Sequence, residues 1–128
     1  MDADWEHAIK RADLDAVREL LRRGADIDAR DGHGQTGLML AANAGTPELV
    51  AMLVEHGAGL DVTAKYGLSA LMLAIVAGHT ETARSLARAG ANLALRGSGA
   101  PGFADKTARD LALARGLHEL AAELEPGM

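Results

Sequence analysis

The sequence predicts an all-α repeat solenoid, in which helix–turn–helix units stack and short β-turn hairpins join them. The segment Leu-Leu-Arg-Arg-Gly-Ala-Asp-Ile at 20–27 recurs in related form at 53–60 and 86–93, each time 33 residues further on. A second series, Ala12, Gly45 and Gly78, has the same 33-residue step. Aromatic residues make up only 2% of the 128 residues, so the core must consist of Ala, Leu, Val, Ile and Met. Such a core favours closely packed small helices.

Each unit is expected to contain two helices, as the second unit illustrates. Residues 36–45 read as a short apolar helix that ends at a glycine, and Pro47 opens a second helix that runs to His56. Gly57 follows at a position where a left-handed backbone is cheapest for glycine. Neither helix can hide its apolar stripe alone, so neighbouring units must stack. The expected units of this single domain, residues 1–128, are about 1–30, 31–63, 64–95 and 96–128.

The first unit lacks a hairpin and is expected to act as a cap. Trp5 falls where the central units carry Leu38 and Leu71. A large side chain at that position is expected to be buried and to cover the exposed end of the stack.

The last unit is expected to form helices at 107–116 and 117–124. The interval from Ser69 to Thr107 is 38 residues, longer than the repeat, and the excess falls in the turn-rich segment 97–102. An insertion there lies between units, so it lengthens a flexible loop without disturbing the stack.

Two segments carry a family signature. Asp31-Gly-His-Gly-Gln-Thr-Gly-Leu-Met-Leu-Ala-Ala, and its counterpart at 64–75, resemble the Asp-x-x-Gly-x-Thr-Pro-Leu-His-x-Ala-Ala signature of the ankyrin-repeat family. Both depart from it, since Pro is replaced by Gly37 and Ala70 and His by Met39 and Met72. The family's usual Thr–His hydrogen bond is therefore absent, and methionine packing is expected in its place. The resemblance covers nearly the whole chain and implies two full central units between two divergent capping units.

Composition excludes several classes of function. Cysteine is absent, which excludes disulfides, thiol chemistry and cysteine-based zinc sites. A net charge of −5 with only three aromatic residues argues against nucleic-acid binding. No apolar run is long enough to span a bilayer, and the acidic start at residues 1–6 is unlike a secretory signal. We therefore expect a cytoplasmic protein that binds neither nucleic acid nor membrane.

The sequence offers little for catalysis. The five histidines include none at i, i+3 or i+4 spacing, so no helix-borne zinc motif is present, and His56 and His79 are expected to be structural. Gly97 and Gly102 have the spacing of a phosphate-binding loop, but Phe103 stands where Lys-Ser/Thr is required. A plain loop between units is favoured there. Ser69 is expected to cap a helix rather than act as a nucleophile. We expect no enzyme activity, no cofactor and no metal.

The resemblance implies a non-enzymatic protein-binding module, such as an adaptor, an inhibitor or a chaperone of a partner protein. Binding is expected through the hairpin tips and the concave face formed by the first helices. The positions expected to contact the partner are Arg30, His33, Gln35, Asn43, Lys65, Tyr66, Leu68, Val76, Phe103 and Lys106.

Tyr66 and Phe103, the chain's single Tyr and single Phe, both fall at hairpin or loop positions, where aromatic side chains suit an interface. The alternative is that Phe103 folds back over the last unit's first helix and Tyr66 over the neighbouring hairpin. Two other functions stay open. One is a small-ligand or enzymatic role of the loop 97–106, and the other is a structural or self-associating role. A monomer with one unidentified protein partner is the primary expectation.

Overall fold

The computed structural model describes residues 1–126 and confirms the all-helical repeat fold. These residues form eight α-helices and one 3-10 turn, and they contain two isolated β-bridges but no strand. The expected helix 47–56 ends one residue earlier, at Glu55, and 127–128, the end of the expected fourth unit, lie outside the described residues. The helices are α1 (Ala3–Lys10), α2 (Leu14–Arg22), α3 (Gly37–Ala44), α4 (Pro47–Glu55), α5 (Ala70–Val76), α6 (Thr80–Arg88), α7 (Ala108–Ala114) and α8 (His118–Glu123), with the 3-10 turn η1 at Lys65–Gly67.

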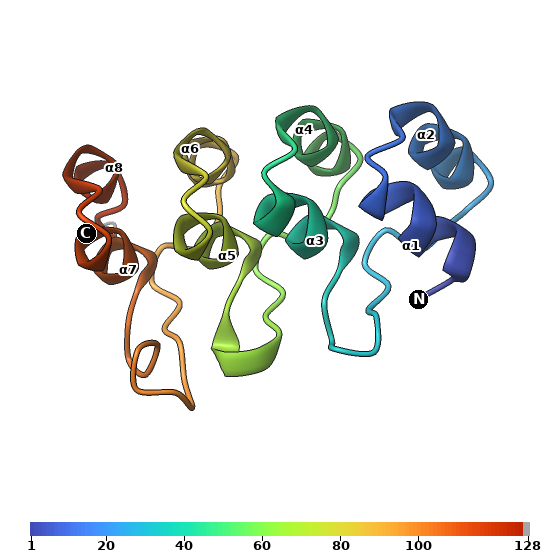
Figure 1. Cartoon of the computed structure of the whole chain (residues 1–128). Coiled ribbons are helices and arrows are strands. Elements are labelled where there is room, and N and C mark those ends of the chain that lie inside the picture. Colours follow the sequence, from blue (N-terminus) through green and yellow to red (C-terminus); the bar gives the residue numbers. More distant parts are fainter. Residues whose placement is uncertain (127–128) are drawn as a thin grey trace.

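The helices form four antiparallel pairs in a row (Figure 1). The first helices of the pairs, α1, α3, α5 and α7, pack on one another in one layer, and α2, α4, α6 and α8 form the second layer. The loops that lead into α3, α5 and α7 project past the first layer, on the side away from the second (Figure 1). Three loops therefore line up along one edge of the stack.

A repeated hydroxyl residue begins each of α3, α5 and α7. Thr36, Ser69 and Thr107 are buried, and each side-chain oxygen accepts a hydrogen bond from the backbone N–H three residues on, at 3.3, 3.3 and 3.2 Å. This bond satisfies one of the N–H groups that the first helical turn leaves unpaired. Ser69 is thus a helix cap, as the sequence predicts.

A residue with left-handed backbone follows each of the second helices α2, α4 and α6. Gly24, Gly57 and Gly90 have φ values of 92°, 90° and 107°. This conformation is strained for any residue with a Cβ, which explains the glycine at this repeat position. The predicted left-handed conformation of Gly57 is confirmed.

The core consists of aliphatic and methionine side chains, as predicted. Met39 and Met72, which replace the family's histidine, are both fully buried. Trp5 is also buried, at 2% exposure. The predicted burial of Trp5 is therefore confirmed. A Cβ on Gly37 at the start of α3 would lie only 3.4 Å from Trp5 Nε1, so the indole packs into the joint between α1 and α3. It also lines a hollow with Met1 and Leu20.

Candidate functional site

The candidate site is the hairpin row, formed by the loops 30–36, 63–69 and 96–107. The first turn of the row is built around Asp31. Its carboxylate accepts hydrogen bonds from the backbone N–H groups of His33 and Gln35, both at 2.9 Å. Burial alone raises the pKa of Asp31, but these two bonds, with the charges of His33 and Lys10, outweigh it and hold the pKa below its ordinary value. Asp31 thus shapes the turn that presents His33.

Hydrogen bonds connect the three loops to one another. Arg30 Nη1 donates to the carbonyl of Thr63 in the next loop at 3.0 Å, and Ser98 N–H donates to the carbonyl of Tyr66 at 2.7 Å. Arg96 Nη1 closes the last loop on the carbonyl of Asp105 at 2.8 Å. The row is therefore one connected surface.

Tyr66 stands out by its backbone. It has φ 63° and ψ 19°, the left-handed region that aromatic residues rarely adopt. Its side chain is 36% exposed, and its ring lies 5.4 Å from the ring of Phe103. Lys65 Nζ lies 5.0 Å from the centre of the same ring, within the range of a cation–π contact. Together these residues form an aromatic and cationic cluster between the second and third loops.

The two aromatic residues follow the sequence-based alternatives only in part. Phe103 is half-buried and packs against the core, as the fold-back alternative expects. Tyr66 lies over the neighbouring loop, since a Cβ on Gly99 would be 3.1 Å from its Cδ1. The Tyr66 ring nevertheless stays accessible at the surface.

One expected contact residue is not accessible. Leu68 is only 5% exposed, because its side chain belongs to the hydrophobic core. Arg30, His33, Lys65 and Lys106 are exposed, and Gln35 is half-buried. Sequence reasoning missed Arg96, which is exposed in the third loop. The repeat gives a signal for it, because Arg96 is two 33-residue steps from Arg30.

The expected positions on the first helices lie beside this row. Asn43 is exposed and Val76 is half-buried. Their backbone carbonyls accept hydrogen bonds from the next unit, from His79 Nε2 at 3.0 Å and from Arg115 Nη1 at 2.8 Å. His56 Nδ1 bonds within its own helix, to the carbonyl of Met52 at 2.8 Å. The two histidines thus make structural contacts, as expected.

The loop 97–106 does not form a phosphate cradle. The backbone N–H groups of Gly97, Phe103, Ala104 and Asp105 all donate to carbonyls of the same loop, at 2.9 to 3.0 Å. A phosphate-binding loop directs such groups toward the ligand instead. The expected plain loop between units agrees with this geometry, although its internal bonds fold it more tightly than its glycines suggest. Within residues 1–126, no group of three His, Asp or Glu side chains is placed to hold a metal.

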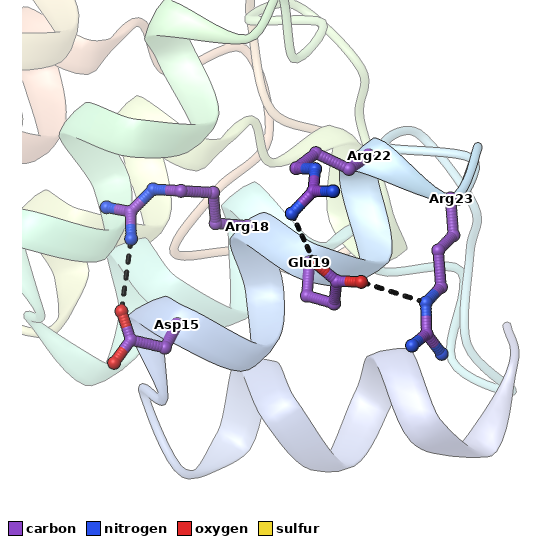
Figure 2. A network of polar contacts seen from close by, with 5 residues as sticks. All are labelled: Asp15, Arg18, Glu19, Arg22 and Arg23. Atoms are coloured by element: carbon purple, nitrogen blue, oxygen red, sulfur yellow. Dashed lines mark hydrogen bonds and ion pairs between the residues drawn. The ribbon is translucent and has the colours of Figure 1, made fainter.

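The opposite side of the molecule pairs its charges internally. On α2, Arg18 lies 3.1 Å from Asp15, while Glu19 contacts both Arg22, at 2.7 Å, and Arg23, at 3.1 Å (Figure 2). In the hairpin row, Arg30, Lys65, Arg96 and Lys106 form no ion pair with any described residue. The same loops contain two carboxylates, Asp31 and Asp105, so the hairpin row has an excess of positive charge that an external group can neutralise.

Comparison with known proteins gives a family match. The family model for ankyrin repeats, in three copies, matches residues 5–96. Two Rickettsia felis proteins that are named as ankyrin repeat proteins are each 50% identical to this chain over 38 residues. That segment is 30% of this chain and 60% and 58% of the two relatives, so the match spans about three fifths of these curated relatives. No helix among the described residues is long and apolar enough to cross a membrane.

Proposed function

The chain belongs to the ankyrin-repeat family, and we propose on that premise that it binds a partner protein through the hairpin row and the concave face of the first helices. Ankyrin repeats are generally protein–protein interaction modules, and the family is generally non-enzymatic. In this proposal the protein acts in the cytoplasm as an adaptor, an inhibitor or a chaperone of its partner. The helix pair α7–α8, beyond the matched residues, serves as its fourth unit and closes the proposed domain 1–128.

One observation carries the proposal, namely the conformation of Tyr66. A left-handed backbone costs about 1–3 kcal/mol for a residue with a bulky side chain, and such strain clusters at functional positions. Folding gains little in return, because the ring is 36% exposed. An accessible aromatic residue held in a strained turn is well suited to anchor an interface.

The charge of the hairpin row supports an acidic partner surface. Lys65 lies over the Tyr66 ring, and Lys106 is exposed in the same loop as Phe103. Neither lysine forms an ion pair with a described residue. Cations at the rim of an interface steer association with an acidic surface, even for a chain of net charge −5. The proposed contact set is therefore Arg30, His33, Gln35, Lys65, Tyr66, Arg96, Phe103 and Lys106, with Asn43 and Val76 on the first helices.

The experiment compares three baits in affinity capture from a lysate of the native cell. The first bait is the unaltered chain, the second carries Tyr66→Ala and Lys65→Ala, and the control carries Arg18→Ala and Arg22→Ala on α2. We expect the first and third baits to retain a protein that the second bait loses. All three baits must show the same helical circular dichroism and melting temperature within a few degrees.

Titration calorimetry with the captured protein then measures the contribution of the ring. Loss of an aromatic anchor weakens binding by about 1–3 kcal/mol. Capture of the same proteins with equal affinity by all three baits contradicts the proposal.

A further inference from the structure

The repeat defines which first-helix positions face the next unit. A residue with left-handed backbone follows each first helix, at Ala12, Gly45, Gly78 and Gly116, with φ of 51°, 70°, 83° and 75°. We call the residue seven positions earlier the forward position and the residue eight positions earlier the receiving position. The forward positions are Trp5, Leu38, Leu71 and Arg109, and the receiving positions are Asp4, Gly37, Ala70 and Ala108.

The first joint shows how the two positions meet. Gly37, at the receiving position of α3, lies against forward-facing side chains of α1, since its Cβ would be 3.4 Å from Trp5 Nε1 and 3.2 Å from Ile9 Cδ1. At the later joints, Leu38 and Leu71 are fully buried, as are Ala70 and Ala108. The first joint therefore pairs large forward side chains with a small receiving residue, and the later joints have large and small buried residues at the same positions.

The end at α7 leaves its forward side open within the described residues. Arg109 takes the forward position. Its side chain makes no hydrogen bond or ion pair with residues 1–126, and its Nε is buried without a partner. Leu113 lies one turn later on the same face, where Ile9, Ala42 and Ile75 are buried. It is 37% exposed, so this end presents one cation and one aliphatic side chain.

The end at α1 has the complementary features. Asp4 takes the receiving position, is exposed, and forms no ion pair with the described residues. Beside it, a hollow of about 270 Å³ opens between α1 and α2. Ala8, Ala16 and Leu20 are its apolar lining, and its polar lining consists of Asp4, Asp13 and Glu19 together with His7 and Arg11.

From this match we propose that the chain self-associates head to tail, with the α7 end of one copy against the α1 end of a second copy. Arg109 then pairs with Asp4 of the second copy, in the register in which Trp5 meets Gly37. Leu113 enters the apolar hollow between α1 and α2. An ion pair already spans a joint within the chain, from Arg84 to Glu123 at 2.7 Å.

This association goes beyond the proposed binding function and uses other residues. The two faces differ, so the contact is heterologous and adds copies in a row instead of closing a dimer. A contact that depends on an exposed ion pair weakens with salt. The sequence alone predicts a monomer. We therefore expect the head-to-tail association only at high protein concentration and low salt.

Charge reversal in sedimentation velocity tests the proposal. Arg109→Asp alone and Asp4→Arg alone each place like charges at the contact, and each is expected to weaken association about tenfold or more. An equimolar mixture of the two variants is expected to recover association, because each contact between one variant and the other joins opposite charges. The double variant in one chain is expected to recover association for the same reason.

Two matched controls carry the same charge changes elsewhere, Lys65→Asp in the hairpin row and Glu48→Arg on α4. Both are expected to associate like the unaltered chain, and circular dichroism checks that each variant folds. A chain that stays monomeric at every concentration overturns the proposal, and so does a mixture that fails to recover association. Neither result bears on the hairpin row, which the capture experiment tests separately.

Discussion

The joints between units and the hairpin row are held together by different interactions. The centre of a joint is buried and apolar, as where Trp5 and Ile9 of α1 meet Gly37 of α3. The hairpin row is held by backbone hydrogen bonds, exposes its cations, and contains a tyrosine with a strained backbone. The joints therefore supply most of the stability of the stack, since burial of apolar surface is the dominant favourable contribution to folding. The row is free to serve recognition. Substitutions in the two regions should separate these roles.

The largest effect on stability is expected for Trp5→Ala at the first joint. Removing a fully buried indole leaves a cavity between α1 and α3, and the free energy of unfolding should fall by about 3 kcal/mol or more. Chemical denaturation followed by circular dichroism measures this loss. Trp5→Phe is the matched control and should lose less, because it keeps a ring and removes an indole N–H that is buried without an acceptor. Tryptophan fluorescence of the native chain typical of a water-exposed indole would contradict the packing of Trp5.

The next effect compares two left-handed glycines. Gly57→Val should cost about 1 kcal/mol or more, because a β-branched residue resists φ of 90° while a Cβ there meets no other atom within 4 Å. Gly45→Val should cost about 1–3 kcal/mol more, since its Cβ would also lie 2.5 Å from His79 Nδ1 across the joint to the next unit. Denaturation midpoints measure both. Equal losses of stability in the two variants would show that the His79 side chain moves aside without a measurable effect.

The 33-residue repeat makes the joints between units predictable from the sequence, whereas the hairpin row is harder to predict. A 33-residue period fixes which side chains share a position, so the core leucines, the cap Ser69 and the glycine at 57 follow from it. It does not fix which way a side chain turns where the pattern changes. The period places Trp5 at the same core position as Leu38 and Leu71, but it does not say which neighbouring helix the indole meets. The turn near Leu68 predicts an exposed contact, although the Leu68 side chain lies in the core.

The third hairpin loop was the least predictable part. Its extra residues have no counterpart in the other units, so the contact of Phe103 with Tyr66 depends on long-range packing that no local pattern encodes. The sequence alone also does not indicate that the receiving position at one end and the forward position at the other end complement each other. Only the packed joints reveal that Asp4 and Arg109 stand where Gly37 and Trp5 meet.

A smaller effect is expected from acid, through the capping box that begins α7. The Asp110 side chain accepts the Thr107 backbone N–H at 3.0 Å, and this bond first of all holds the pKa of Asp110 below its ordinary value of 3.8. A carboxyl with a lower pKa in the folded state adds stability above its unfolded pKa and loses it as the pH falls through the folded value. The melting temperature should therefore fall between about pH 5 and pH 3.

Asp110→Asn should remove part of this acid dependence. Its melting temperature should start lower at pH 7 and converge with that of the unaltered chain at low pH. Asp4→Asn, which alters a carboxylate without a partner among the described residues, is the control and should run parallel to the unaltered chain. A constant difference between Asp110→Asn and the unaltered chain at every pH would show that the capping box is insensitive to acid.

The smallest effect on stability is expected in the hairpin row, at Tyr66. Tyr66→Ala removes the ring contact with Phe103, and aromatic pairs contribute about 0.5–1.5 kcal/mol. Alanine keeps the strain of a Cβ at φ 63°, whereas Tyr66→Gly relieves it. The loss from Tyr66→Ala should therefore stay near or below 1 kcal/mol, and Tyr66→Gly should melt close to the unaltered chain.

Binding should respond in the opposite order to stability, and this makes Tyr66 the decisive test of the comparison. Both Tyr66 variants lack the ring, so both should weaken the captured partner by about 1–3 kcal/mol, although Tyr66→Gly leaves the fold nearly unchanged. Trp5→Ala should do the reverse, because it loosens the first joint yet leaves the ring pair intact. Calorimetric titration beside melting curves gives both quantities for each variant. If Tyr66→Ala melts early and binds normally once folded, the ring contributes to packing and not to binding. At that residue the hairpin row would then stabilise the fold, as the joints do.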